Sequence, residues 1–159
     1  MKKQDHLPLM GVGPFIVGGQ LIITAGGITL SCLGYLYGEY SAILKTPLLI
    51  LGVILILLGI VLWYSANFKA KIDEGITNNQ LVTTGVYAWV RNPIYSAFFL
   101  VCLGAVLISN NPVLLFVPVL NWIYMTIFLK LTEEKWLENL YGAEYLEYCK
   151  RVNRCIPWF

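Results

Sequence analysis

Residues 81–95 read LVTTGVYAWVRNPIY and separate two apolar segments from two more. This is the only long stretch of the chain that is neither an uninterrupted apolar run nor a charged tail. Asn92 and Pro93 predict the start of a helix, because Asn is a favoured N-cap and Pro loses no needed donor at the first helical position. The free amides and the dipole of such a helix start favour an anionic group. A loop with an ordinary cap would have the same sequence, so both interpretations stay open.

The composition predicts a membrane protein. Of the 159 residues, 58% are hydrophobic and only 13% are charged, far from the usual balance of a soluble domain. The length fits one domain, residues 1–159. The net charge of +2 and the scattered basic residues disfavour nucleic acid as a partner. The predicted fold class is an all-α membrane protein with about four transmembrane helices and a cytoplasmic C-terminal helical segment.

Four apolar segments are candidate transmembrane helices: residues 13–36, 46–66, 94–109 and 112–131. The first is longer than the apolar region of a signal peptide and is expected to be retained. The second is long enough to cross a bilayer. The third is short and is expected to begin within the membrane interface. Asn121 lies inside the fourth, where a polar side chain is costly unless it bonds another helix or belongs to a site.

The chain becomes amphipathic after Leu131. Apolar residues recur there at helical spacing among glutamates, which predicts helices outside the membrane. Gly142 is expected to separate two short helices. The last residues, 157–159, are expected to lie back on the membrane surface.

The basic residues predict the orientation of the chain in the membrane. If all four segments cross, ten of the eleven Lys and Arg residues fall on one side, and only Lys45 falls on the other. The ten are Lys2, Lys3, Lys69, Lys71, Arg91, Lys130, Lys135, Lys150, Arg151 and Arg154. The positive-inside rule then places both termini and the stretch 81–95 in the cytoplasm.

The four cysteines show no CxxC spacing and have no histidine near them, so no metal site is predicted. They are expected to be apolar fillers or free thiols in a reducing compartment. The sequence also lacks the phosphate-binding, dinucleotide-binding, zinc-protease and nucleophile-elbow motifs.

Residues 81–95 resemble the Arg-His-Pro-x-Tyr region of isoprenylcysteine carboxyl methyltransferases and of their phospholipid methyltransferase relatives. The C-terminal signature of that family resembles Glu133-Glu134, residues 141–148 (YGAEYLEY), Arg151-Val152 and Ile156-Pro157. The two regions follow the family's order and together cover residues 79–159. The resemblance implies an integral membrane enzyme that transfers a methyl group from S-adenosylmethionine, bound on the cytoplasmic side, to a lipid or a lipidated molecule.

The resemblance also implies which residues bind the cofactor. They are Asn79, Gln80, Leu81, Val82, Tyr87, Asn92, Pro93, Ile94, Tyr95 and Glu133. Aromatic faces such as Tyr87 and Tyr95 suit a sulfonium cation, and the Glu133 carboxylate suits ribose hydroxyls or an amino group. The dipole at the start of the third span favours the carboxylate of the cofactor. Arg91, in the matched motif, and Lys130 are the candidate catalytic residues.

Two positions depart from the family pattern. Asn92 stands where the family has a histidine, and it cannot titrate near neutral pH. Leu129 stands where the family has an arginine that meets the acidic group of the substrate. The adjacent Lys130 could take the place of that arginine, although its ammonium is a point charge and cannot make two parallel hydrogen bonds. Alternatively, Lys130 is an ordinary lysine at the membrane surface. A carboxylate acceptor needs no general base whereas a protonated amine does, so the missing histidine favours a carboxylate.

Two other function classes fit parts of the sequence. Polytopic reductases of the steroid type have a loosely similar C-terminal end and bind NADPH, whose extra phosphate would need a site such as Arg151 and Arg154. A non-catalytic membrane scaffold would fit if Asn92 and Leu129 mark a decayed site.

Overall fold

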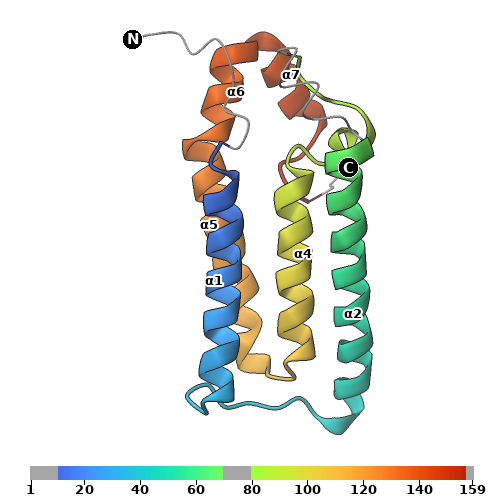
Figure 1. Cartoon of the computed structure of the whole chain (residues 1–159), viewed down its shortest axis with the longest axis vertical. Coiled ribbons are helices and arrows are strands. Elements are labelled where there is room, and N and C mark those ends of the chain that lie inside the picture. The colour runs from blue at the N-terminus through green and yellow to red at the C-terminus, as the bar shows by residue number, and fades with distance from the viewer. Residues whose placement is uncertain (1–10, 70–79, 157–159) are drawn as a thin grey trace.

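The computed structural model describes residues 11–69 and 80–156, which form a bundle of helices (Figure 1). The helices are α1 (Gly13–Cys32), α2 (Ala42–Tyr64), α4 (Pro93–Ile108), α5 (Phe116–Leu131), α6 (Glu133–Tyr141) and α7 (Ala143–Arg151). Short turns of other helix types are η1 (Ser65–Lys69), η2 (Gly85–Ala88) and η3 (Pro112–Leu115). Within the described ranges there is no β-strand, only an isolated bridge between Val90 and Asn153. The predicted all-α class is confirmed.

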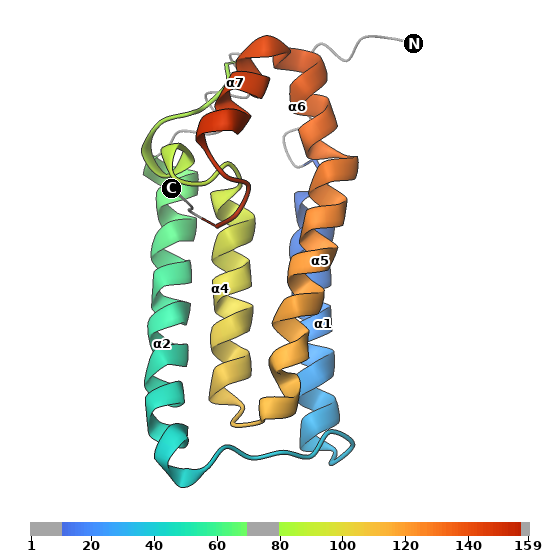
Figure 2. The ribbon, with the colours of Figure 1, turned by 180° about the vertical axis from the view of Figure 1, so that it is seen from behind.

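The four long helices alternate in direction along the chain, so that α1 and α4 run one way and α2 and α5 run the other, and α4 lies at the centre of the bundle (Figure 1, Figure 2). α4 packs against α1, α2 and α5, while α1 also packs against α5. One end of the bundle, which we call the motif end, contains residues 80–92, α6, α7 and residues 152–156. The opposite end contains the connections 33–41 and 109–111. The two stretches that resemble the family signatures therefore lie at the same end.

The helices have the length and composition of an integral membrane protein. α1, α2 and the helical unit Pro112–Tyr141 are long and apolar enough to cross a membrane. α4 is apolar but has only 16 residues. At 1.5 Å per residue it is about 24 Å long, shorter than the roughly 30 Å of a bilayer core. The third apolar helix is therefore short, as the sequence predicts.

Two helix boundaries differ from the sequence-based ones. α1 ends at Cys32, earlier than expected, because Gly34 adopts a φ of 82° that a helix cannot accommodate. α2 begins at Ala42, also earlier than expected, because the amide of Lys45 donates to the Ser41 carbonyl at 3.1 Å. The second apolar segment was expected to begin only at residue 46, after Lys45, but a single lysine does not prevent helix formation.

Glycines allow α2 and α4 to pack with their backbones in contact. A Cβ atom on Gly52 would lie 2.7 Å from the Gly104 carbonyl oxygen, and one on Gly104 would lie 2.5 Å from that of Gly52. A Cβ atom on Gly59 would lie 2.7 Å from the Ala97 carbonyl oxygen. Small residues at such contacts are what allows helices to approach closely inside a membrane. This contact holds α4, and the stretch before it, against α2.

Two buried polar pairs connect α1 and α5. Asn121 Nδ2 donates to Thr24 Oγ1 at 2.8 Å, and Gln20 Nε2 donates to Met125 Sδ at 3.3 Å. Both amide side chains are fully buried, where no water competes for the bond. Asn121 therefore links two helices, the first of the two explanations given for it.

Candidate active site

The C-terminal segment, residues 152–156, runs along the start of α4. The backbone amides of Arg91 and Asn92 donate to the carbonyls of Asn153 and Arg154, at 2.8 and 3.0 Å. This pairing joins the two family-like regions although they are far apart in the sequence.

Ser96 and Cys155 extend the same contact one turn into α4. Ser96 Oγ donates to the Cys155 carbonyl at 2.9 Å, and Cys155 Sγ lies 3.8 Å from Met125 Sδ. Burial raises the pKa of the Cys155 thiol to about 12. This cysteine is therefore a protonated, packed side chain, in line with the predicted role of apolar filler.

Tyr95 and Glu133, two of the predicted cofactor residues, are in direct contact. The Tyr95 hydroxyl donates to Glu133 Oε1 at 2.5 Å, and the Tyr95 side chain is only 8% exposed. Ile16, Met125 and Leu129 form a buried apolar cluster with Tyr95. A carboxylate and a phenol thus meet at the edge of an apolar core, which is a suitable place to hold the polar groups of a ligand.

One irregular residue before Glu133 separates α5 from α6. Thr132 leaves the helical region (φ −125°, ψ −86°), so α5 ends there and Glu133 and Glu134 lie in the first turn of α6. Acidic residues suit the positive end of a helix. Gly142, with a φ of 53°, separates α6 from α7 as the sequence predicts.

A carboxylate between two arginines lies beside this pair. Glu134 accepts from Arg154 Nε at 2.7 Å and from Arg154 Nη2 at 2.8 Å, and its Oε1 lies 3.2 Å from Arg91 Nη2. The hydrogen bond to Glu134 raises the pKa of Arg154, so the guanidinium stays charged. We call Arg91, Glu134 and Arg154 the clamp.

The guanidinium of Arg91 also contacts α7. Its Nη1 donates to the Tyr145 hydroxyl at 3.0 Å and to Cys149 Sγ, and its Cζ lies 5.7 Å from the centre of the Tyr145 ring. Burial raises the pKa of Tyr145, so its hydroxyl stays neutral. These contacts give Arg91 a structural role, and its catalytic role stays a prediction.

α7 also fixes the turn that carries Tyr87. The Tyr148 hydroxyl donates to the Tyr87 carbonyl at 2.5 Å, and both residues are buried. Gly85, with a φ of 62°, begins this turn, a conformation that favours glycine.

The N-cap prediction for Asn92 is right in position and wrong in mechanism. α4 begins at Pro93, but the Asn92 side chain makes no capping bond. Its Nδ2 donates instead to the Arg154 carbonyl at 3.2 Å, because the C-terminal segment lies where the amide can reach it. Asn92 therefore binds the segment that covers the helix start.

Lys130 is not brought to the Tyr95–Glu133 pair. Leu129 is fully buried against Tyr95, whereas Lys130 is exposed and has no hydrogen-bond or ion-pair partner among the described residues. Neighbouring positions of a helix do not face the same way, so only one of the two can point to the pair. The position where the family has an arginine is thus part of the apolar core here.

The other predicted cofactor residues lie around the same end. Asn79 falls outside the described residues. Gln80 is exposed, Leu81, Val82 and Ile94 are half-buried, and Pro93 is buried. In the described part of the chain, no cluster of three or more His, Cys, Asp or Glu residues could hold a metal ion.

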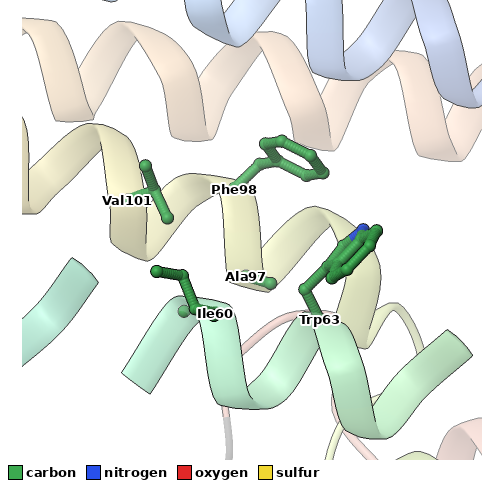
Figure 3. A pocket seen from close by; sticks show the side chains of 6 residues that line it. Ile60, Trp63, Ala97, Phe98 and Val101 are labelled. Atoms are coloured by element: carbon green, nitrogen blue, oxygen red, sulfur yellow. The ribbon is translucent and has the colours of Figure 1, made fainter. Parts of the chain in front are cut away.

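An apolar groove of about 240 Å³ lies between α2 and α4 (Figure 3). Its lining consists of Gly59, Ile60, Trp63, Ala97, Phe98 and Val101. Ile60 and Trp63 project from α2, and Phe98 and Val101 project from α4. The groove begins within one turn of Tyr95 along α4.

A family model described as phospholipid methyltransferase matches residues 47–144, more than half of the chain. The chain belongs to the phospholipid methyltransferase family. This membership implies a methyl donor, and it gives no support to the NADPH-dependent reductase.

Three curated relatives of this family member carry the name protein-S-isoprenylcysteine O-methyltransferase. The Saccharomyces cerevisiae protein is 36% identical over 97 residues, covering 60% of this chain and 38% of that protein. The Xenopus laevis protein is 33% identical over 122 residues, covering 71% and 42%. The Schizosaccharomyces pombe protein is 42% identical over 79 residues, covering 48% and 33%. The chain thus spans less than half the length of these relatives, and no solved structure matches it significantly.

Sequence reasoning missed the clamp and the contact between Ser96 and Cys155. Glu134 and Arg154 both lie in the matched C-terminal region, but nothing in their spacing pairs them with Arg91. Only the chain reversal through α6 and α7 brings the three together.

Proposed function

We propose that this chain is a membrane methyltransferase that uses S-adenosylmethionine and methylates a carboxylate, or another head group, of a lipidic acceptor. The observation that carries the proposal is the hydrogen bond between Tyr95 and Glu133, which joins the two family-like regions. The names of the relatives support an isoprenylated cysteine as the acceptor class.

The polar groups of the site fit this cofactor. Glu133 Oε1 accepts from Tyr95, while Oε2 has no hydrogen-bond partner among the described residues. One carboxylate oxygen is therefore available to the hydroxyl or amino groups of a ligand, as charge-assisted bonds require. When bound, S-adenosylmethionine supplies a methyl group on a sulfonium, and such a cation is attracted by aromatic rings such as Tyr87 and Tyr95.

The chain itself has to orient the reactants and exclude water. The buried cluster of Ile16, Met125 and Leu129 keeps one side of Tyr95 dry. Alignment of the reacting groups is the larger part of the task, because the cofactor already carries a good leaving group. A carboxylate acceptor is ionised at neutral pH and needs no base from the protein. Arg91 and Lys130 remain the candidates for meeting its charge.

The groove between α2 and α4 supports a lipidic acceptor. Its lining is wholly apolar, and Ile60 and Trp63 are exposed on the surface of the bundle. Such a surface offers van der Waals contacts to a hydrocarbon chain, and close packing of this kind drives association within a bilayer. An acceptor whose chain lies there would have its head group near the motif end.

We infer that residues 1–159 form one domain and that the motif end faces the cytoplasm. Lys69 ends η1 and Lys130 lies in the last turn of α5, both at the motif end, whereas Lys45 lies at the opposite end. In single-cysteine variants, Tyr40→Cys should react with an impermeant maleimide from outside and Lys150→Cys should not. Labelling of Lys150→Cys from outside would reverse the orientation.

The function is tested by methyl transfer in lipid nanodiscs. Purified protein is incubated with methyl-labelled S-adenosylmethionine and a farnesylated cysteine peptide, and the control is the same peptide with an amidated C-terminus. We expect label only on the peptide with a free carboxylate, released by base as methanol. Base-resistant label on an amine acceptor would correct the reaction to N-methylation. Absence of transfer to any lipidic acceptor would refute the proposal.

A further inference from the structure

We propose that Glu134 is a positioning residue that, through its two arginines, holds the start of α6 so that Glu133 faces Tyr95. The inference rests on the function proposed above for the Tyr95–Glu133 pair. It assigns to the clamp a role in ligand affinity and not only in stability.

Packing alone does not fix the direction of α6. None of the residues of α6, all of which the structure describes, is buried. The backbone at Thr132 departs from helical dihedral angles, so a single irregular residue lies between α5 and α6. A helix with little buried surface behind such a break needs polar contacts at its start to hold one orientation. Glu133 and Glu134 supply those contacts.

The clamp has the geometry to do this. Arg154 binds Glu134 through two parallel hydrogen bonds of 2.7 and 2.8 Å, the arrangement that gives a guanidinium–carboxylate pair its directional specificity. The side chains are only 10% exposed at Arg91, 15% at Glu134 and 24% at Arg154. Little water competes, so loss of the carboxylate leaves two poorly solvated cations facing each other.

The two arginines are themselves held by the backbone. Arg91 lies two residues before Pro93, where α4 starts, and its amide donates to the carbonyl of Asn153, next to Arg154. Glu134 therefore attaches α6 to two chain segments that are hydrogen-bonded to each other, the one before α4 and the C-terminal one. Successive helix residues diverge by about 100°, so Glu134 faces this element while Glu133 faces Tyr95. Release of Glu134 frees α6 to turn at Thr132 and moves Glu133 away from the Tyr95 hydroxyl.

The test is a double-mutant cycle on binding of S-adenosylhomocysteine to the full chain in nanodiscs. Glu134→Gln should weaken binding about tenfold, the effect of losing a charge-assisted bond. Glu138→Gln, exposed on the same helix, should leave the affinity unchanged. In a Glu133→Gln background, Glu134→Gln should cause no further loss, because Glu134 acts through Glu133. Additive losses, or no loss from Glu134→Gln, would overturn the proposal.

A second readout needs no ligand. Hydrogen exchange of the α6 backbone amides should accelerate about tenfold in Glu134→Gln and remain as in the parent chain in Glu138→Gln. If Glu134→Gln does not fold, Arg154→Lys is measured instead. Lysine keeps the positive charge but cannot make two parallel hydrogen bonds to Glu134, so exchange of the α6 amides should accelerate less than tenfold. Unchanged exchange in a folded variant would overturn the positioning role. Failure of the parent chain to bind S-adenosylhomocysteine would refute the proposed function and leave the exchange result to decide on Glu134.

Discussion

Replacing Gly104 by alanine places a methyl group where α2 and α4 touch. The new Cβ would lie 2.5 Å from the Gly52 carbonyl oxygen and 2.8 Å from Ile56 Cγ1, whereas ordinary van der Waals contact begins at 3.4 Å. The first clash is with backbone, so the helices have to separate. A gap of about 0.5–1 Å forfeits a quarter to a half of each dispersion contact along the interface.

The expected cost follows from these terms. Overpacking of this kind destabilises by about 1–3 kcal/mol. Alanine recovers part of that, because it is better than glycine within a helix by about 0.5–1 kcal/mol. The matched control is Gly26→Ala on α1, where a Cβ atom meets nothing within 4 Å. This control should be neutral or slightly stabilising.

The free energy of unfolding is measured by reversible denaturant titration in mixed micelles. We expect a lower midpoint for Gly104→Ala and an unchanged or higher midpoint for Gly26→Ala. Equal stability of the two variants would show that α2 and α4 do not pack through their glycines.

Three further predictions concern the motif end. Tyr95→Phe should weaken binding of S-adenosylhomocysteine about ten- to a hundredfold, since a hydrogen bond to a charged group is worth about 1.5–3 kcal/mol; unchanged calorimetric affinity would mean that the hydroxyl does not hold Glu133. Lys130→Ala should leave the affinity for S-adenosylhomocysteine unchanged, because the side chain is exposed. A lower kcat/KM of this variant for an isoprenylcysteine acceptor would show that Lys130 binds substrate and is not only a membrane anchor. Iodoacetamide should modify Cys155 slowly at neutral pH, and the rate should still rise with pH beyond roughly 8.5, the pKa of a free thiol, because burial raises the pKa of this thiol; mass spectrometry of the C-terminal peptide measures the rate, and a rate that levels off near that pH would contradict the burial.

Much of the fold could be predicted from the sequence because its determinants are local. Apolar runs of membrane length define α1, α2 and the helical unit Pro112–Tyr141 that contains α5, and Asn92-Pro93 marks the start of α4. Gly142 separates the last two helices because its backbone conformation favours glycine. Each of these features depends on residues close together in the chain.

The site could be predicted only in part because its contacts are long-range. The family resemblance named Tyr95 and Glu133, and they are in contact across 38 positions. It did not indicate that Arg91 would pair with Glu134, since that contact depends on the path of the chain through α6 and α7. It also placed Lys130 at the site, although the helical rotation that buries its neighbour turns Lys130 outwards.

Glu133 is proposed to bind the methyl donor, and calorimetry with S-adenosylhomocysteine measures that binding without a methyl acceptor. The variants are Glu133→Gln and, as a matched control, Glu147→Gln, whose exposed carboxylate pairs only with Lys150 among the described residues. We predict that the parent chain binds S-adenosylhomocysteine and not NADPH, and that Glu133→Gln loses about 1–3 kcal/mol of binding free energy while Glu147→Gln loses none. Equal effects at the two positions, or binding of NADPH alone, would show that Glu133 does not bind a methyl donor.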